Sequence, residues 1–321
     1  MSSERWRVLV GSKSFGQAFP EHLTTLEGEG FEIIPNGVGG RAYHADELMT
    51  ALKGVQVIVT GTDELTAEVI AAADSLRLIA KHGVGLETID LEAAKQKGVV
   101  VTSTPGAIHE SVADLTLALL LAVARNLVPV HVATQAGGWK SGFGLELMDK
   151  QIGIIGLGRI GKGVALRAKG FGMKLAAYDP YPDQVFAAQH GVQFMELDDL
   201  IRTSDVVSLH AAAEQVEGVL IDARRIGLMK KNAIFLNTAR GSLVDEAALA
   251  AALREKRLWG AGLDAFVDEP PKGSPLLALD NVVLTPHMAG RTLDGLRRMG
   301  EITMENCRRV RAGQDALYRV V

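Results

Sequence analysis

Residues 152–161 read IGIIGLGRIG, an apolar strand that runs directly into the pattern Gly-x-Gly-x-x-Gly. Gly156 permits a tight turn, Gly158 lets the backbone approach a pyrophosphate, and Gly161 lets the following helix pack closely on the strand. The helix predicted over residues 162–169 would offer free N–H groups and the positive end of its dipole to phosphates. The stretch therefore predicts the phosphate-binding turn of a doubly wound α/β domain.

Asp179 indicates which dinucleotide this turn would hold. It ends the next predicted strand, residues 174–178, at the distance of about 20 residues from the glycine turn that is typical of a ribose-binding acid. Its carboxylate would accept hydrogen bonds from both ribose hydroxyls and repel a 2′-phosphate, and residues 180–182 supply no arginine to offset that repulsion. We therefore expect NAD rather than NADP. The alternative is a purely structural turn, with Asp179 as an ordinary loop acid.

Strands alternate with helices on both sides of this turn. In the N-terminal third, the predicted strands are residues 7–10, 31–34, 55–59, 76–80 and 99–101, with helices at 19–29, 46–52, 66–73 and 90–97. From residue 151 onward, the predicted strands are residues 151–155, 174–178, 192–194, 206–209, 233–237, 260–263 and 282–284. Such alternation predicts parallel sheets that are covered by helices on both faces.

A long helix over residues 107–125 separates the two series, and a final helix over residues 293–312 has no strand after it. We expect this final helix to pack back on the first domain. The predicted fold is α/β, with two Rossmann-like, doubly wound parallel-sheet domains. A discontinuous, flavodoxin-like substrate domain would comprise residues 1–102 and 289–321, and an NAD-binding domain residues 103–288.

Composition supports a compact enzyme and disfavours other classes. The 321 residues are 47% hydrophobic and 22% charged, and 34 basic against 38 acidic residues leave a net charge of −4. Because long runs of one charge sign are absent, we expect neither a nucleic-acid nor a membrane partner. Cys307 is the single cysteine and the eight histidines show no ligand spacing, so no metal site is expected. A start without a signal-peptide pattern favours the cytoplasm.

Three ionisable residues follow late strands of the second series: Arg240, Glu269 and His287. Oxidation of a hydroxy acid needs a base for the hydroxyl proton, a cation for the carboxylate and an acid that tunes the base. Histidine, arginine and glutamate suit these tasks. Each also has an ordinary interpretation, as a surface cation, a loop acid and a packed loop histidine, and spacing alone does not show that the three converge.

Six blocks of sequence carry a resemblance to a known family. They are HGVG at residues 82–85, TPG at 104–106, GLGRIG at 156–161, NTARG at 237–241, LDAF at 263–266 followed by EP at 269–270, and TPH at 285–287. In this order they resemble the D-isomer-specific 2-hydroxyacid dehydrogenase family, and most closely its 3-phosphoglycerate dehydrogenase-like branch. The resemblance covers nearly the whole chain.

The resemblance implies a role for each matching residue. Arg240 would bind the carboxylate and the keto or hydroxyl oxygen of the substrate, His287 would be the acid/base, and Glu269 its partner. The backbone N–H groups of Val84 and Gly85 would hold the substrate carboxylate. The residues implied at the cofactor are Gly156, Gly158, Arg159, Ile160, Gly161, Asp179, His210, Thr238, Ala239, Arg240, Asp264, His287 and Gly290. Asp264 would hold the nicotinamide carboxamide.

The identity of the small 2-hydroxy or 2-keto acid stays open at this level. Residues 60–63 read TGTD, whereas the phosphoglycerate enzymes tend to carry an arginine there that meets the phosphate. Cations that could still meet a distal anion are Lys13, Arg41, Lys81 and Arg291, of which Arg291 is the best candidate, although pairing on the last helix would suit it as well. The alternatives are 3-phosphoglycerate, hydroxypyruvate or glyoxylate, and another acid with a second anionic group.

Two further hypotheses concern function and assembly. The same fold serves NAD(H)-sensing corepressors of the C-terminal-binding-protein group, in which binding matters more than turnover. The helix over residues 107–125 and the loop through Trp139 resemble the dimer arm of the family, so a homodimer is expected. Leu115, Leu119 and Val123 would belong either to the core or to that interface.

Overall fold

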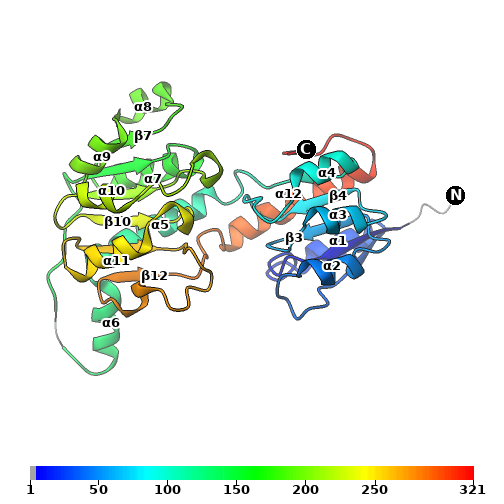
Figure 1. Ribbon diagram of the computed structural model, residues 1–321, viewed down its shortest axis with the longest axis horizontal. Coiled ribbons are helices and arrows are strands. Elements are labelled where there is room, and N and C mark those ends of the chain that lie inside the picture. Colours follow the sequence, from blue (N-terminus) through cyan, green and yellow to red (C-terminus); the bar gives the residue numbers. More distant parts are fainter. Residues whose placement is uncertain (1–4, 140) are drawn as a thin grey trace. The chain divides into compact units, whose positions relative to one another are not determined.

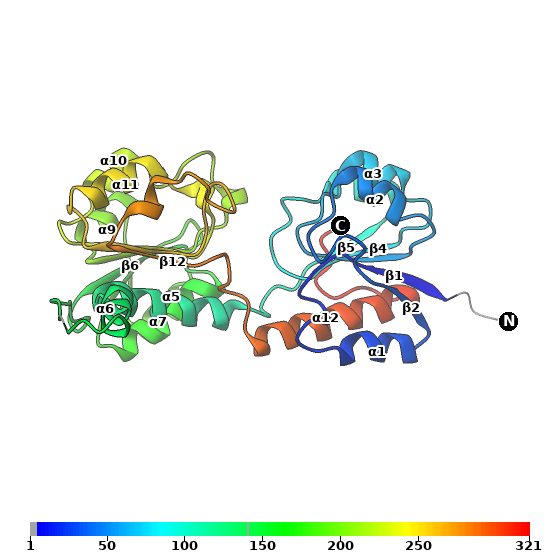
Figure 2. The same cartoon turned by 90° about the horizontal axis from the view of Figure 1, so that it is seen from below.

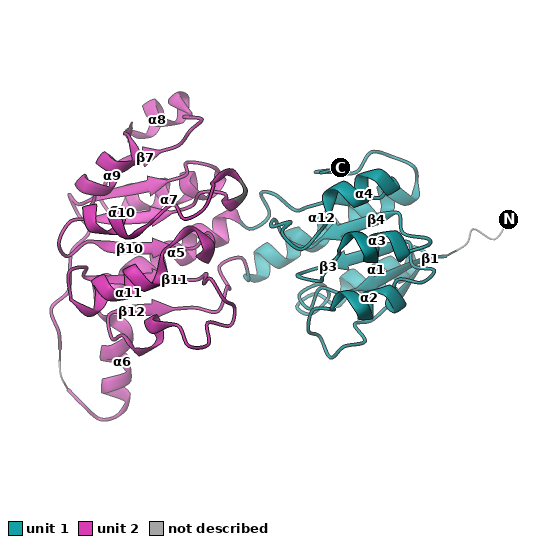
Figure 3. Cartoon of the chain, in the orientation of Figure 1, with its two compact units in different colours: residues 1–108, 291–321 teal, residues 109–290 magenta. Residues whose placement is uncertain are grey.

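The computed structural model describes residues 5–139 and 141–321 (Figure 1). The chain forms two compact units (Figure 3). Unit 1 combines the described residues up to Ile108 with Arg291–Val321, and unit 2 is His109–Gly290. The first domain is therefore discontinuous, as the sequence predicted.

The chain crosses between the units at 108/109 and 290/291, rather than at the predicted 102/103 and 288/289. The first crossing lies later because Ala107 is buried in a hydrophobic cluster of unit 1 with Phe19 and Leu296. The second lies later because the backbone N–H of Ala289 donates to Asp264, a residue of unit 2.

Unit 1 contains a five-stranded parallel sheet of order β2-β1-β3-β4-β5, the order of a flavodoxin-like fold. Its strands are β1 Trp6–Val10, β2 Phe31–Ile34, β3 Val57–Thr60, β4 Leu78–Lys81 and β5 Val100–Thr102. Its helices are α1 Glu21–Gly28, α2 Ala45–Ala51, α3 Ala67–Ala72, α4 Leu91–Lys97 and α12 Leu293–Arg311. Helices α1 and α12 cover one face of the sheet, and α2 and α3 cover the other (Figure 2).

The final helix α12 packs on the sheet of unit 1, which confirms the expectation from the sequence. The hydroxyl of Thr292 caps its N-terminus by accepting from the N–H of Gly295, as helix N-caps commonly do. Met304 and Cys307 are buried against the sheet, because residues three apart share a face of a helix.

Unit 2 contains a seven-stranded parallel sheet of order β12-β11-β10-β9-β6-β7-β8. Its strands are β6 Gln151–Ile155, β7 Lys174–Tyr178, β8 Val192–Phe194, β9 Val206–Leu209, β10 Ile234–Asn237, β11 Gly260–Leu263 and β12 Val282–Leu284. The strand order reverses between β6 and β9. The carboxyl ends of these two strands therefore form the switch point at which doubly wound sheets bind ligands.

Helices cover both faces of this second sheet. The helices are α5 His109–Ala124, α6 Leu127–Gln135, α7 Arg159–Gly170, α8 Gln184–His190, α9 Leu197–Thr203, α10 Ala223–Leu228 and α11 Glu246–Arg254, with 3-10 turns η1 Ala213–Gln215, η2 Gly241–Leu243 and η3 Pro275–Ala278. Helices α5 and α7 pack on one face, and α9, α10 and α11 on the other (Figure 2).

Every strand predicted from the sequence has an observed counterpart whose ends differ by at most two residues. The helix predicted over residues 107–125 is observed as α5, and a second helix, α6, which was not predicted, follows after its N-cap Asn126, whose φ is 50°. Among the described residues no single helix is both long and apolar enough to span a membrane. Only α5 and α6 together reach that length and composition, across a bend of 67°.

Candidate active site

The glycine turn joins β6 to α7 at the switch point of unit 2. Gly156 has φ +93°, and a Cβ there would lie 2.8 Å from the backbone of His210. A Cβ on Gly161 would lie 2.1 Å from the carbonyl oxygen of Gly156, so both positions exclude side chains. Gly158 differs, because no atom lies within 4 Å of the place that its Cβ would take. Its backbone is therefore open to a ligand, as a pyrophosphate requires.

Asp179 lies beside this turn at the carboxyl end of β7. One carboxylate oxygen accepts from the backbone N–H of Leu157 at 2.7 Å, and the other accepts from that of Tyr181 at 2.8 Å. The half-buried side chain is thus fixed against the glycine turn rather than free in a loop. An open turn with a carboxylate fixed at its edge fits a nicotinamide dinucleotide, whose phosphates and ribose need these two features.

Arg240 lies in the turn between β10 and η2. The side chain of Asn237, at the end of β10, shapes this turn. Its carbonyl oxygen accepts from the N–H of Ala239, and its amide nitrogen donates to the carbonyl oxygen of Arg240, both at 2.9 Å. Asn237 was not among the predicted site residues. An asparagine at a strand end could have indicated this turn, because its side chain commonly bonds to the backbone two residues further on.

His287 and Glu269 form a hydrogen-bonded pair. The Nδ1 of His287 lies 2.9 and 2.7 Å from the two carboxylate oxygens of Glu269. One of these oxygens also accepts from the N–H of Phe266 at 3.1 Å. The histidine side chain is 48% exposed and that of the glutamate 37%, so the pair is accessible to a substrate in unit 2.

The backbone of His287 is in the left-handed region, with φ 49°, which is uncommon for residues other than glycine. Asp264 stabilises the turn around it. One oxygen of the buried Asp264 carboxylate accepts from Met288 N–H at 2.9 Å and from Thr285 Oγ1 at 2.5 Å, and the other accepts from Ala289 N–H at 2.8 Å. Asp264 therefore holds the histidine turn, and its role toward a nicotinamide stays a prediction.

Electrostatics links the three groups. The hydrogen bond to Glu269 raises the pKa of His287 above its ordinary value, against an opposing effect of burial and of Arg240. Burial raises the pKa of Glu269, but the hydrogen bond and charge of His287, with Arg240, bring that pKa below its ordinary value. The turn of Arg240 packs against the loop of Glu269, because a Cβ on the adjacent Gly241 would lie 1.9 Å from the carbonyl carbon of Phe266. The structure thus joins His287 to Glu269 and brings the turn of Arg240 against the same loop.

His210 lies behind the glycine turn, directly after β9. Its Nε2 is 2.7 Å from Ser208 Oγ and its Nδ1 is 3.4 Å from Thr238 Oγ1, which in turn is 3.0 Å from Thr116 Oγ1. Burial lowers the pKa of His210 to about 3, so the ring is neutral. Of the other residues implied at the cofactor, Arg159 and Ile160 open α7, Ala239 precedes Arg240, and Gly290 ends unit 2.

The predicted carboxylate-binding residues Val84 and Gly85 belong to unit 1, just after β4. Val84 is 45% exposed. The preceding Gly83 is anchored by its carbonyl oxygen, which accepts from the N–H of Thr104 at 2.9 Å. Two N–H groups in an exposed glycine-flanked turn can bind an anion, and this role stays a prediction.

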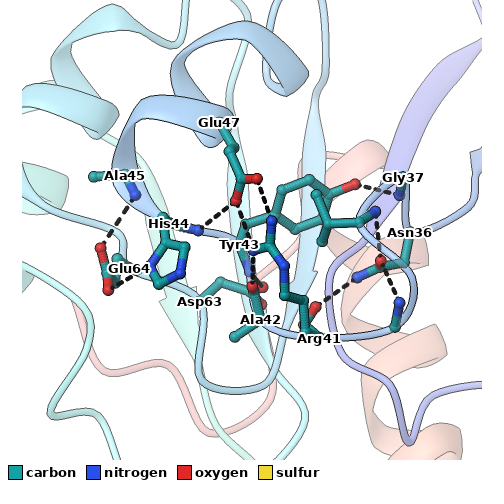
Figure 4. Close-up of polar contacts among 12 residues, drawn as sticks. Asn36, Gly37, Arg41, Ala42, Tyr43, His44, Ala45, Glu47, Asp63 and Glu64 are labelled. Carbon is teal, nitrogen blue, oxygen red and sulfur yellow. Dashed lines mark hydrogen bonds and ion pairs between the residues drawn. The ribbon is translucent and has the colours of Figure 1, made fainter.

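Of the four cations considered for a distal anion, Arg41 is committed to a partner (Figure 4). It forms a two-nitrogen ion pair with Glu47, whose pKa falls to about 2, chiefly because of this bond. Lys81 is buried and donates to the carbonyl oxygen of Gly61.

The other two cations of this set also lie in unit 1. Arg291 donates to Gln17 Oε1 at 3.3 Å, rather than pairing along the last helix. The stem of the exposed Lys13 lies beside Gly40, since a Cβ on that glycine would meet its carbons at 3.8 to 4.0 Å.

A sheet of this strand order, with an open glycine turn and an acid–base pair that follow the carboxyl ends of its strands, is typical of nicotinamide-dependent oxidoreductases. The family model for the D-isomer specific 2-hydroxyacid dehydrogenase, NAD binding domain, matches residues 117–289. The chain belongs to the D-isomer-specific 2-hydroxyacid dehydrogenase family.

Individual relatives agree with this assignment. The chain is 42% identical over 276 residues to D-3-phosphoglycerate dehydrogenase of Methanocaldococcus jannaschii, which covers 84% of this chain and 52% of that protein. It thus spans about half the length of this relative. It is 41% identical over 261 residues to hydroxypyruvate reductase of Thermotoga maritima, which covers 79% of this chain and 84% of that protein. The structure of D-lactate dehydrogenase from Aquifex aeolicus, complexed with NAD and lactic acid, superposes with a TM-score of 0.83 at 30% identity and covers 96% of both chains.

These findings confirm the predicted family, the oxidoreductase class, the two α/β domains and NAD as the cofactor. The relatives named above are dehydrogenases and reductases, so the corepressor interpretation receives no support from them.

Proposed function

We propose that this chain is an NAD-dependent 2-hydroxyacid dehydrogenase that also works as a 2-keto acid reductase. The observation that carries the proposal is the hydrogen-bonded pair of His287 and Glu269, with the turn of Arg240 packed against the loop of Glu269. These groups supply the acid/base, the group that tunes it and the cation that the reaction needs. Similarity to named dehydrogenases and reductases supports the same activity.

When bound, NAD supplies the hydride acceptor for the carbinol carbon, or its reduced form supplies the hydride donor. The residues of the chain handle the proton and the charges. Because Nδ1 of His287 donates to Glu269, the ring keeps its proton there and leaves Nε2 for the substrate oxygen. In oxidation the neutral imidazole removes the hydroxyl proton, and in reduction the imidazolium returns it. Glu269 stabilises the imidazolium, and Arg240 would hold the carboxylate through two parallel hydrogen bonds.

We also propose NAD rather than NADP as the preferred form. Asp179 is held against the glycine turn by two backbone N–H groups, where a carboxylate would repel a 2′-phosphate. Titration of NADH and NADPH by fluorescence tests this preference. Equal or tighter binding of NADPH would contradict it.

For the substrate we propose a small unphosphorylated acid, hydroxypyruvate or glyoxylate, ahead of 3-phosphoglycerate. The loop after β3 carries Asp63, whose buried carboxylate accepts from Tyr43 N–H at 2.8 Å and Thr60 Oγ1 at 2.7 Å. An acid in this loop, with Arg41 already paired to Glu47, makes this part of unit 1 a poor receptor for a phosphate.

We further propose a homodimer formed through α6 and the loop that follows it. None of the α6 residues is buried, and Leu127, Val132, Trp139 and Phe143 are between 58% and 95% exposed. Apolar surface of this kind usually marks an interface. By contrast, Leu119 and Val123 of α5 are buried, and the half-buried Leu115 packs against the same cluster, so these three belong to the core of unit 2. A cytoplasmic location and the lack of nucleic-acid or membrane partners stay predictions.

The decisive experiment is a screen of glyoxylate, hydroxypyruvate and the keto form of 3-phosphoglycerate with NADH, in which the reaction is monitored through the loss of NADH absorbance. We expect turnover of the small acids, and none in the His287→Ala variant, which should still bind NADH. A wild-type protein that binds NADH but reduces none of these acids would contradict the named substrates. Near-normal turnover in the variant would contradict the mechanism.

A further inference from the structure

The loop that carries Glu269 has little regular structure of its own. Between the end of β11 at Leu263 and the start of η3 at Pro275 there is no helix or strand. Residues 267–270 of this loop are exposed. A sheet ladder does not fix these residues, so other contacts must keep the Glu269 carboxylate within hydrogen-bond distance of His287.

Glu246, the first residue of α11, makes such contacts on both sides of Glu269. One carboxylate oxygen accepts from the N–H of Val267 at 2.7 Å, and the other accepts from the hydroxyl of Ser274 at 3.0 Å. The helix does not need Glu246 as a cap, because the neighbouring Asp245 accepts from the N–H of Ala248 at 2.9 Å. The Glu246 carboxylate is therefore directed to the loop.

The backbone around Phe266 joins this contact to the active site. The N–H of Phe266 donates to Glu269 at 3.1 Å, and the next N–H donates to Glu246. Gly241, directly after Arg240, packs against the backbone of Phe266, because a Cβ on Gly241 would be 1.9 Å from the carbonyl carbon of Phe266. The two peptide units on either side of Phe266 thus link the turn of Arg240, the Glu269 carboxylate and Glu246.

We propose that Glu246 is a positioning residue, which clamps the loop at Val267 and Ser274 and so keeps Glu269 in place to accept from His287. The inference rests on the proposed function, in which this pair handles the proton. Glu246 touches neither substrate nor His287 itself and acts through Glu269. A carboxylate suits this role because it accepts two hydrogen bonds from opposite ends of one loop.

Four variants test the proposal. Glu246→Ala removes both contacts. Glu246→Gln has the same charge as the alanine variant but keeps an oxygen for Val267 and an amide group for Ser274. Ser274→Ala removes one of the two contacts of Glu246, together with the bond that the Ser274 hydroxyl accepts from the N–H of Leu276. Glu255→Ala removes an equal charge from the exposed C-terminal end of the same helix and is the matched control.

The first readout is the titration of His287 by NMR, with its signal assigned by its loss in a His287→Gln variant. We expect the pKa of His287 to fall toward its ordinary value in Glu246→Ala and to be restored in Glu246→Gln. The second readout is the pH profile of kcat for glyoxylate reduction. It should shift in the same direction, with kcat about tenfold lower in Glu246→Ala and NADH binding unchanged.

A purely structural role would lower the melting temperature but leave the titration of His287 and the pH profile as in the wild type, and this result would overturn the proposal. An equal shift in Glu255→Ala would also overturn it, because the effect would then be one of net charge. If the wild type shows no turnover, the proposed function fails, and the titration still decides whether Glu246 positions the pair.

Discussion

The replacement Glu269→Gln tests how much the carboxylate contributes to the acid/base function of His287. The variant keeps the size and the acceptor oxygen of the side chain but removes its charge. In the wild type, Nδ1 of His287 lies 2.9 and 2.7 Å from the two carboxylate oxygens. In the variant only one oxygen is left to accept, and it is neutral.

The size of the effect follows from the geometry and the exposure. A hydrogen bond to a charged group contributes about 1.5–3 kcal/mol, but the two side chains are 48% and 37% exposed. Screening by solvent lowers the contribution toward the bottom of this range. About 1.4 kcal/mol corresponds to a tenfold change in rate. We therefore expect kcat for keto-acid reduction to fall about tenfold.

The pH dependence has a defined sign. Glu269 raises the pKa of His287 above its ordinary value of 6.5, so the imidazolium needed for reduction persists to higher pH. In Glu269→Gln the alkaline limb of the reduction profile should shift to lower pH. The stability from the raised His287 pKa is fully present below pH 6.5 and is lost as pH rises through the folded-state pKa. The stability that comes from the lowered pKa of Glu269 is present above pH 4.5 and is lost as pH falls through the folded-state pKa of Glu269.

The assay is the steady-state rate of NADH oxidation by glyoxylate or hydroxypyruvate across the pH range, with thermal melting measured in parallel. The Glu255→Ala variant again serves as the control for loss of one negative charge. An alkaline limb in Glu269→Gln that coincides with that of the wild type would refute the assignment of Glu269 as the partner of His287.

Three further predictions concern cofactor, substrate and assembly. Asp179→Ser should improve NADPH binding relative to NADH, because it removes the carboxylate beside the glycine turn; an unchanged ratio by fluorescence titration would place the ribose elsewhere. Arg240→Lys should raise KM for the keto acid about tenfold or more while NADH binding persists, since an ammonium lacks the two-pronged geometry of guanidinium; steady-state kinetics that match the wild type would argue against carboxylate binding. The double variant Leu127→Asp and Val132→Asp should shift the protein from dimer to monomer in light scattering, because both side chains are 58% exposed and charges there would be buried on association; a wild-type mass in solution would place the interface on another surface.

The strands could be predicted from the sequence because their signal is local. Buried runs such as VIVT at residues 57–60 and LIAK at 78–81 are typical of parallel sheets, whose strands are covered on both faces. The glycine turn was also predictable, since the positive φ of Gly156 and the close approach of Gly161 to the carbonyl oxygen of Gly156 arise within a few residues of chain. Helix α6 was not predicted, although its residues continue the apolar pattern of α5 beyond Asn126.

The sequence by itself therefore determined the two α/β domains, the turn that accepts a dinucleotide and the kinds of side chain available for acid–base chemistry. Only the tertiary structure showed that His287 meets Glu269 and that the turn of Arg240 packs against the loop of Glu269, since these residues follow different strands of unit 2. It also showed that Arg41 forms an ion pair with Glu47 and that Glu246 accepts a hydrogen bond from the loop of Glu269. The physical reason is the sequence distance over which each effect acts. Secondary-structure propensity and hydrophobic periodicity depend on residues close together in the chain, whereas the contacts within a site depend on how distant segments pack.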